Sequence, residues 1–340
     1  MAERAKRDDP PVPEPGIRLS GESLGIDVGG TGVKAALVDL ATGELSSERI
    51  REKTPHPATP DAVAATIATV VGRVLEGRDV TATLPAGCGL PGVIKDGRLM
   101  TAANIDSGWL EVSAEEVIGA AIGRPVLAIN DADAAGIAEM TYGAGAGHLG
   151  TVLLLTIGTG IGTALFIDGR LVPNMELGHV EMRGKDAETL VSGASRERRG
   201  LGWKRWAREF DQYLDRMERY FWPDLIILGG GVSKDLARYE RWLTTRAPIR
   251  PAVHLNASGI IGAAFAAAAA VATPGGPSVD TAVATKPGRG RSTATKRAAP
   301  RPRATPRART TAARATPEVA APAATGRAKR AKPKPAPPQA

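Results

Sequence analysis

The pattern of apolar and polar positions predicts paired β-strands in two distant parts of the chain. Two apolar stretches, residues 24–40 and 151–172, are each interrupted by glycines, which predicts a strand, a tight turn and a second strand in both places. Within the second stretch, Asp168-Gly169 is typical of a two-residue hairpin turn. The chain therefore starts with a hairpin and repeats that unit about 130 residues later.

Strands and helices alternate through the rest of residues 24–272. A helical period spans residues 60–76, with Pro60 in the first turn and Gly77 just after the last. Further strands are expected at residues 80–87, 124–130 and 224–229, and further helices after residue 130, from about Lys234 and over residues 259–271. This alternation predicts an α/β fold.

The segment 203–221 has an apolar stripe at spacings of three and four residues, which predicts an amphipathic helix. A stripe of this kind is far more often part of a core than of a ligand site. We therefore expect these side chains to face the core: Trp203, Trp206, Phe210, Leu214, Met217 and Phe221.

Charge is distributed unevenly along the chain. The formal net charge is +8, but residues 273–340 contain fifteen Lys or Arg against two acids, a net of +13, which leaves −5 for the other 272 residues. Proline, alanine and charge dominate both ends, so the sequence predicts a disordered leader, two α/β lobes and a disordered basic tail. The expected boundaries are residues 1–22, 23–128, 129–272 and 273–340.

The composition also predicts a soluble cytoplasmic protein. Cys88 is the only cysteine, which excludes a disulfide framework and a multi-cysteine zinc site. No apolar segment near the start resembles a secretory signal. The most apolar run, fourteen residues of mostly alanine from Gly259, is too short for a bilayer span, so no membrane association is expected.

Both glycine turns are candidates for binding phosphate. Glycine permits positive φ and lets backbone N–H groups approach an anion closely. One such turn is ambiguous, but two similar Gly-Thr-Gly turns suggest a duplicated fold whose lobes present them to a shared cleft, and the P-loop motif is absent. The candidate phosphate-binding residues are Asp27, Gly29, Gly30, Thr31, Gly32, Lys34, Gly158, Thr159 and Gly160, with Asp27 also a candidate to hold Mg²⁺ through water.

A second candidate site lies at the strand-to-helix junction of residues 128–136. Asp131 could simply cap the helix, but an Asp kept ionised by the helix dipole can also take a hydroxyl proton during phosphoryl transfer. Asn130 beside it offers a donor and an acceptor to a sugar hydroxyl.

Two further motifs have more than one interpretation. Glu176 and His179 are three residues apart, which fits a structural pair, a metal site or, without cysteines nearby, hydroxyl recognition. Gly229, Gly230 and Gly231 join a strand to a helix, which is weak evidence for a nucleotide contact.

Taken in order, these motifs resemble the ROK sugar kinases of the actin, Hsp70 and hexokinase superfamily, and more closely the members of that family that use polyphosphate. The resemblance covers about residues 24–272 and rests on LGIDVGGTGVK, AANIDSGW, AINDADAAG, TIGTGIG, NMELGHVEM and LGGGVS. It implies a two-lobed, actin/hexokinase-like (ribonuclease H-like) fold that closes on glucose, and a homodimer.

The resemblance also implies residue roles. Asp131 would be the base for the glucose 6-hydroxyl, the two glycine turns would hold donor phosphates with Mg²⁺ near Asp27, and Gly229–Gly231 would contact a nucleotide if one is used. The other sugar hydroxyls would be held by Asn104, Asn130, Glu176, His179 and Glu188.

One difference between this sequence and the ROK pattern changes the phosphoryl donor that we expect. ROK proteins carry a zinc-binding cysteine cluster after the Gly-His motif, and this chain has a basic segment there instead. We interpret Arg196, Arg198, Arg199 and Lys204 as a candidate track for polyphosphate, with a solvated charge run as the ordinary alternative.

The leading hypothesis is therefore a glucokinase that uses polyphosphate to make glucose 6-phosphate, with ATP left open as a second donor. The alternatives are a strictly ATP-dependent ROK hexokinase, a ROK repressor, which would need a helix-turn-helix before residue 24, and a protein that binds polyanions or nucleic acid through its tail. The tail itself is either an inert extension or a polyanion-binding segment.

Overall fold

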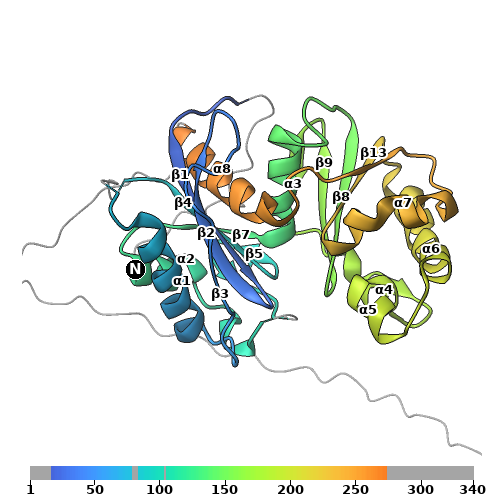
Figure 1. Ribbon diagram of the computed structural model, residues 1–340, viewed down its shortest axis with the longest axis horizontal. Coiled ribbons are helices and arrows are strands. Elements are labelled where there is room, and N and C mark those ends of the chain that lie inside the picture. The colour runs from blue at the N-terminus through green and yellow to red at the C-terminus, as the bar shows by residue number, and fades with distance from the viewer. Residues whose placement is uncertain (1–16, 79–82, 103–104, 274–340) are drawn as a thin grey trace, which may run out of the picture. The chain divides into compact units, whose positions relative to one another are not determined.

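The structure is a computed structural model that describes residues 17–78, 83–102 and 105–273. Its strands form two five-stranded sheets and two small hairpins (Figure 1). The strands are β1 (Glu22–Gly29), β2 (Gly32–Asp39), β3 (Ile50–Glu52), β4 (Ala86–Leu90), β5 (Ile94–Lys95), β6 (Arg98–Leu99), β7 (Leu127–Asn130), β8 (Thr151–Ile157), β9 (Ile161–Ile167), β10 (Arg170–Val172), β11 (Glu181–Met182), β12 (Lys185–Asp186), β13 (Leu225–Gly229) and β14 (Ile249–Pro251). The helices are α1 (Pro60–Leu75), α2 (Ala114–Ile122), α3 (Asp131–Tyr142), α4 (Ala187–Val191), α5 (Gly193–Arg198), α6 (Trp203–Phe221), α7 (Leu236–Tyr239) and α8 (Ser258–Ala272).

The two large sheets have the same topology. The first has the order β3-β2-β1-β4-β7 and the second β10-β9-β8-β13-β14. In each, three antiparallel strands are followed by two strands parallel to the first strand of the unit. The duplication suggested by the two glycine turns is therefore visible in the strand order.

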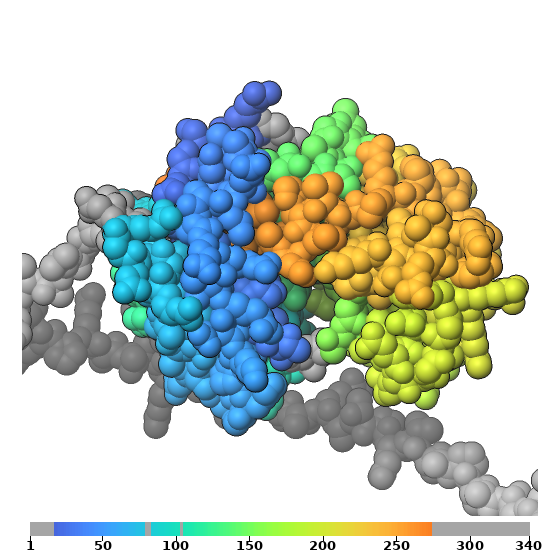
Figure 2. Space-filling view, in the orientation of Figure 1, coloured from blue at the N-terminus to red at the C-terminus, as the bar shows by residue number. Residues whose placement is uncertain are grey.

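Helix α8 packs against the first sheet although it ends the described chain. Gly25 of β1 lies under the Ile260 carbonyl and Gly87 of β4 under the Ala263 carbonyl, so closely that a Cβ at either glycine would overlap with the helix backbone. The space-filling view shows this orange segment directly beside the blue N-terminal strands (Figure 2). Small residues at these positions allow the contact.

Helix α3 makes a comparable contact with the second sheet. Gly136 faces Phe166 and Ala164 of β9, where a Cβ would lie 2.7 Å from the Phe166 ring. The two helices also touch each other, because Gly262 of α8 lies against the Ala134 carbonyl of α3. Helices α3 and α8 therefore connect the two sheets.

The long amphipathic helix has the predicted bounds. Trp206, Phe210, Leu214 and Met217 are fully buried in the core of the second half, while Trp203 and Phe221 are half-buried. The predicted Asp168-Gly169 turn joins β9 to β10, and both residues have the positive φ of 50° and 77° that this turn requires.

Three expectations about elements were wrong. Of the strand predicted at residues 80–87, residues 80–82 lie outside the described residues, and residues 83–85 precede the strand β4, which begins at Ala86 after Pro85, a residue with no N–H for a strand ladder. The helix predicted from Lys234 is a 3₁₀ turn followed by the single turn α7. The closing apolar segment is longer than expected: residues 255–272 could span a membrane by length and composition, but 72% of that window is buried, as in a core helix.

The predicted leader and tail lie mostly outside the described residues. Ile17 and Leu19, at the described end of the leader, pack against the core formed around α3, β8 and α8. The tail beyond Thr273 is not described.

Candidate active site

The junction between β7 and α3 positions the candidate base. Asn130 is the N-cap of α3, and its side-chain oxygen accepts hydrogen bonds from the N–H groups of Ala132 (2.9 Å) and Asp133 (3.0 Å). Such a cap is worth about 1 kcal/mol. Asp131 is therefore the first residue of the helix and not its cap, which leaves its carboxylate available.

Asn130 is occupied by contacts within the protein. Its amide group donates to the Gly92 carbonyl (3.0 Å) and to Glu176 (3.3 Å). In this conformation the residue positions α3 and Glu176, and its donor and acceptor are not free for a sugar hydroxyl as the sequence suggested.

Asp27 and Asp131 lie at the same end of the first sheet, on β1 and directly after β7, with β4 between these two strands. Asp27 pairs with Gly89 in the β1–β4 ladder, and a Cβ at Gly89 would lie 3.5 Å from the Asp131 Cα. Lys34 donates to Asp27 Oδ2 at 2.7 Å, and both side chains are mostly buried. The lysine charge is thus directed at Asp27, and the pair lies beside the N-terminal end of α8, where a Cβ at Gly259 would lie 3.0 Å from the Asp27 carboxyl carbon.

The electrostatic environment of Asp131 differs from the expectation. Burial, and next the negative charge of Asp27, raise the pKa of Asp131 to about 7. Backbone N–H groups of the helix oppose this shift only in part. The sequence predicted that the helix dipole keeps Asp131 ionised near neutral pH; burial and Asp27 instead bring its pKa into that range, which suits a general base.

Asp133 is a further acid that the sequence analysis passed over. It is 1% exposed, its Oδ2 accepts the Asn174 N–H at 2.7 Å, and its Oδ1 has no hydrogen-bond partner. Burial raises its pKa to about 7 as well. Asn174 in turn bonds both the N–H (2.8 Å) and the carbonyl (2.9 Å) of Ile94, so Asp133 ties α3 to the loop that carries Glu176.

Glu176 and His179 lie together on the next segment. His179 is 3.7 Å from Glu176 and 3.0 Å from Asp186, and the Asp186 hydrogen bond is the largest cause of its raised pKa. Burial raises the pKa of Glu176. Glu188 accepts the Ile161 N–H at 3.2 Å, directly after the second glycine turn.

The two glycine turns at residues 29–32 and 158–160 expose their backbone as the sequence suggested, but without positive φ at their glycines. Gly29, Gly30, Gly32, Gly158 and Gly160 are absent from the described residues with positive φ. At Gly30 and Gly158 a Cβ would meet nothing within 4 Å, so both turns expose bare backbone, and Thr31 and Thr159 lie at their centres. A cavity of about 420 Å³ is lined by residues that include Gly29, Gly30 and Asp106.

Among the glycines at residues 29–32, 158–160 and 229–231, Gly230 is the one whose backbone conformation requires glycine. Its φ is 74°, and a Cβ there would lie 2.5 Å from the Ile157 carbonyl oxygen. Because β13 is parallel to β8, Gly229–Gly231 and Gly158–Gly160 follow the same edge of the second sheet.

The basic side chains of residues 196–204 lie in different environments. Arg199 forms two hydrogen bonds with Glu209, at 2.8 and 3.1 Å. Arg196 stacks on the Trp203 ring at 4.0 Å, and Arg198 donates to the Thr189 carbonyl. Lys204 is exposed. Asn104, the remaining predicted sugar contact, lies outside the described residues.

The repeated sheets and the acids at their strand ends define an actin/hexokinase-like α/β protein. Comparisons with known proteins identify its relatives within this fold. The chain is 45% identical over 257 residues to the polyphosphate glucokinase of Mycobacterium tuberculosis, which covers 75% of this chain and 94% of that protein. The structure of inorganic polyphosphate/ATP-glucomannokinase from Arthrobacter sp. strain KM matches with a TM-score of 0.70 and 49% identity, over 72% of this chain and 98% of the other. A ROK family glucokinase from Streptomyces griseus, in complex with glucose and AMPPNP, matches with a TM-score of 0.63 and 26% identity, over 73% and 99%.

Residues 23–200 match the model of the ROK family. The chain belongs to the ROK family.

Proposed function

We propose that the protein is a glucokinase that transfers a phosphoryl group from inorganic polyphosphate, and also from ATP, to the 6-hydroxyl of glucose. The observation that carries the proposal is the convergence of Asp131, Asp27 and Glu176, within a ROK chain that is 45% identical to a polyphosphate glucokinase. A half-buried carboxylate with a pKa near 7 beside two exposed backbone turns suits proton removal next to a bound phosphate.

In the proposed reaction, Asp131 accepts the proton of the glucose hydroxyl as its oxygen attacks the terminal phosphorus. The new oxygen–phosphorus bond forms while the bond to the rest of the donor breaks, and the shortened polyphosphate, or ADP, leaves. Asn130 holds Glu176 and the start of α3 in place. Glu176, His179 and Glu188, with Asn104, are the proposed contacts to the remaining sugar hydroxyls.

Backbone N–H groups of the turns at residues 29–32 and 158–160 are the proposed phosphate contacts, together with Lys34. Gly229–Gly231 would contact the nucleotide when ATP is the donor. We retain residues 23–128 and 129–272 as the proposed lobes of the enzyme.

Mg²⁺ fits this site as a partner of the donor phosphates. The described residues contain no group of three His, Cys, Asp or Glu arranged to hold a metal ion, and Mg²⁺ at phosphate-transfer sites commonly uses one or two carboxylates together with substrate phosphates. Asp27 would hold the ion through water. When bound, the ion neutralises phosphate charge.

The donor is tested by supplying the purified protein with glucose, Mg²⁺ and either polyphosphate or ATP in parallel and measuring glucose 6-phosphate. We expect product with both donors and a higher kcat/KM with polyphosphate. Turnover with ATP alone would favour the strictly ATP-dependent ROK hexokinase, and the absence of product with both donors would remove the assignment.

The family assignment leads us to propose a homodimer in the cytoplasm, and the charge of the tail suggests a role in collecting polyanions. Residues 273–340 carry a net charge of +13. Flexible polyphosphate and nucleic acid are both attracted to such a segment in a salt-dependent way.

The tail role is tested in the full-length chain by replacing its fifteen Lys and Arg with Gln. We expect the apparent KM for long polyphosphate to rise several-fold at low salt and to converge with that of the unmodified chain at high salt. An unchanged KM at low salt would indicate that the tail is inert toward this donor, and unchanged retention on DNA would exclude the nucleic-acid role.

A further inference from the structure

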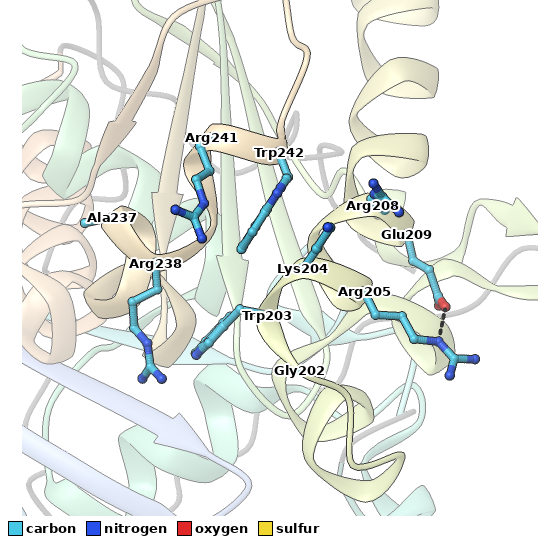
Figure 3. Close-up of a pocket in the computed structure, with 10 residues that line it drawn as sticks. All are labelled: Gly202, Trp203, Lys204, Arg205, Arg208, Glu209, Ala237, Arg238, Arg241 and Trp242. Atoms are coloured by element: carbon cyan, nitrogen blue, oxygen red, sulfur yellow. Dashed lines mark ion pairs between the residues drawn. The ribbon is translucent and has the colours of Figure 1, made fainter.

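A large surface groove lies between the start of α6 and the segment that contains α7. Its volume is about 940 Å³. Figure 3 shows the rings of Trp203 and Trp242 between the arginines of residues 238–241 on one side and the cations of α6 on the other. The lining residues are Gly202, Trp203, Lys204, Arg205, Arg208, Glu209, Ala237, Arg238, Arg241 and Trp242, which we call the α6–α7 groove.

The α6–α7 groove is strongly cationic. Five of its lining residues are Lys or Arg and one, Glu209, is acidic. Glu209 is already neutralised from outside the lining by Arg199, which bonds both of its oxygens at 2.8 and 3.1 Å. Arg238 is paired with Asp235 at 3.1 Å and Arg205 is 3.9 Å from Glu209, whereas no ion pair is recorded for Lys204, Arg208 or Arg241 within the described part of the chain.

The tryptophans of the α6–α7 groove hold guanidinium groups in place. Arg196 and Arg238 lie over the Trp203 ring at 4.0 and 5.2 Å, and Arg241 lies over Trp242 at 4.2 Å. Tyr239 stacks on Trp203 at 5.3 Å. The ring of Trp203 is thus occupied, so it presents fixed positive charge and no free face on which a nucleobase could stack.

The α6–α7 groove is connected to the glycine turns by two short segments. Ala194 in the first turn of α5 donates to the Gly158 carbonyl at 3.0 Å, and Arg196, two residues later, stacks on Trp203. On the other side, Gly231 begins the 3₁₀ turn that leads into α7 and Arg238. Seven residues separate Gly231 from Arg238, and seven residues in helical conformation span roughly 10 Å, a length that a chain of several phosphates could bridge.

We propose that the α6–α7 groove binds the distal part of a linear polyphosphate chain whose terminal phosphoryl group lies at the glycine turns. This inference rests on the proposed use of polyphosphate and adds a second anion site, remote from the transferred group. Its chemistry favours a repeating inorganic anion because five lining residues are cationic and the Trp203 ring already carries Arg196, Arg238 and Tyr239. Long donors engage both sites, whereas ATP and tripolyphosphate engage only the glycine turns.

The test is the full-length variant Arg208→Gln/Arg238→Gln/Arg241→Gln, assayed with long-chain polyphosphate, tripolyphosphate and ATP. We expect the KM for long polyphosphate to rise about tenfold at low salt, because three charge contacts are lost. The kcat, and the KM for tripolyphosphate, ATP and glucose, should stay within twofold. The matched control Arg73→Gln/Arg78→Gln/Arg219→Gln removes the same charge from exposed positions outside the groove and should leave all five values unchanged, the KM for long polyphosphate included.

Direct binding separates this proposal from the proposed reaction. In a background whose tail Lys and Arg are replaced by Gln, fluorescently labelled long polyphosphate should bind the groove variant about tenfold more weakly than the parent, because the variant keeps only the contacts at the glycine turns. If polyphosphate binding depends on the groove but polyphosphate is not turned over, the groove is a polyphosphate site and the proposal that polyphosphate is the phosphoryl donor is wrong. Equal binding by parent and groove variant, or a KM change restricted to ATP, would overturn the groove proposal, and retained ATP turnover shows that the variant is folded.

Discussion

Asp131→Asn should lower kcat/KM with either donor by about three orders of magnitude, within the range of 10²–10⁴ that general-base catalysis supplies. The substitution keeps the shape of the side chain at the start of α3 and removes its ability to accept the hydroxyl proton. Asn130, which caps the helix, is untouched. The thermal unfolding midpoint should therefore stay close to that of the unmodified protein, and glucose binding should persist.

The matched control is Asp61→Asn, which removes an acid from the first turn of α1, far along the chain from the β7–α3 junction. The kcat/KM of Asp61→Asn should equal that of the unmodified protein. Near-normal turnover in Asp131→Asn would contradict the assignment of Asp131 as the base, whatever its effect on stability.

The pH dependence gives an independent measure of the same residue. Because burial and Asp27 raise the pKa of Asp131 to about 7, the base is protonated and inactive below that pH and ionised above it. We expect kcat/KM to rise between pH 6 and 8 with a midpoint near 7. A midpoint near the ordinary value for Asp, about 4, would contradict the environment described for Asp131.

Gly262→Val should cause a large loss of stability. A Cβ at this position would overlap with the Ala134 carbonyl, where α8 and α3 touch, and both partners are buried backbone that cannot move independently. We expect a loss of more than about 4 kcal/mol in the free energy of unfolding, a size reserved for severe core defects. The thermal midpoint should fall by about 10 °C or more.

Gly72→Ala provides the comparison, because Gly72 is exposed within α1 and a Cβ there meets nothing within 4 Å. It should raise the free energy of unfolding by about 0.5–1 kcal/mol. A midpoint for Gly262→Val equal to that of the parent would show that the helices can separate at that contact without cost.

The sequence predicted the elements whose signal is local. The helix at residues 203–221 and the turn at Asp168-Gly169 follow from side-chain spacing and from turn chemistry, and both were confirmed. The duplicated fold could also be inferred, because two similar turns imply two similar units, and the strand orders agree.

The parts that could not be predicted depend on contacts between distant segments. Asn130 was expected to face a sugar, but its bonds to Gly92 and Glu176 require the folded arrangement of three segments. The raised pKa of Asp131 depends on Asp27, more than one hundred residues earlier. The α6–α7 groove combines α6 with Arg238 and Arg241, which carry no motif in the sequence.

The reciprocal placement of α3 and α8 has a consequence for folding. Each helix follows the last strand of its own sheet, yet α8 covers β1 and β4 of the first sheet and α3 contacts β9 of the second. If the two halves were separated, the first sheet would lose its contact with α8 and the second sheet its contact with α3. We therefore expect the described domain to unfold in a single cooperative thermal transition, because each repeat is covered by a helix that belongs to the other.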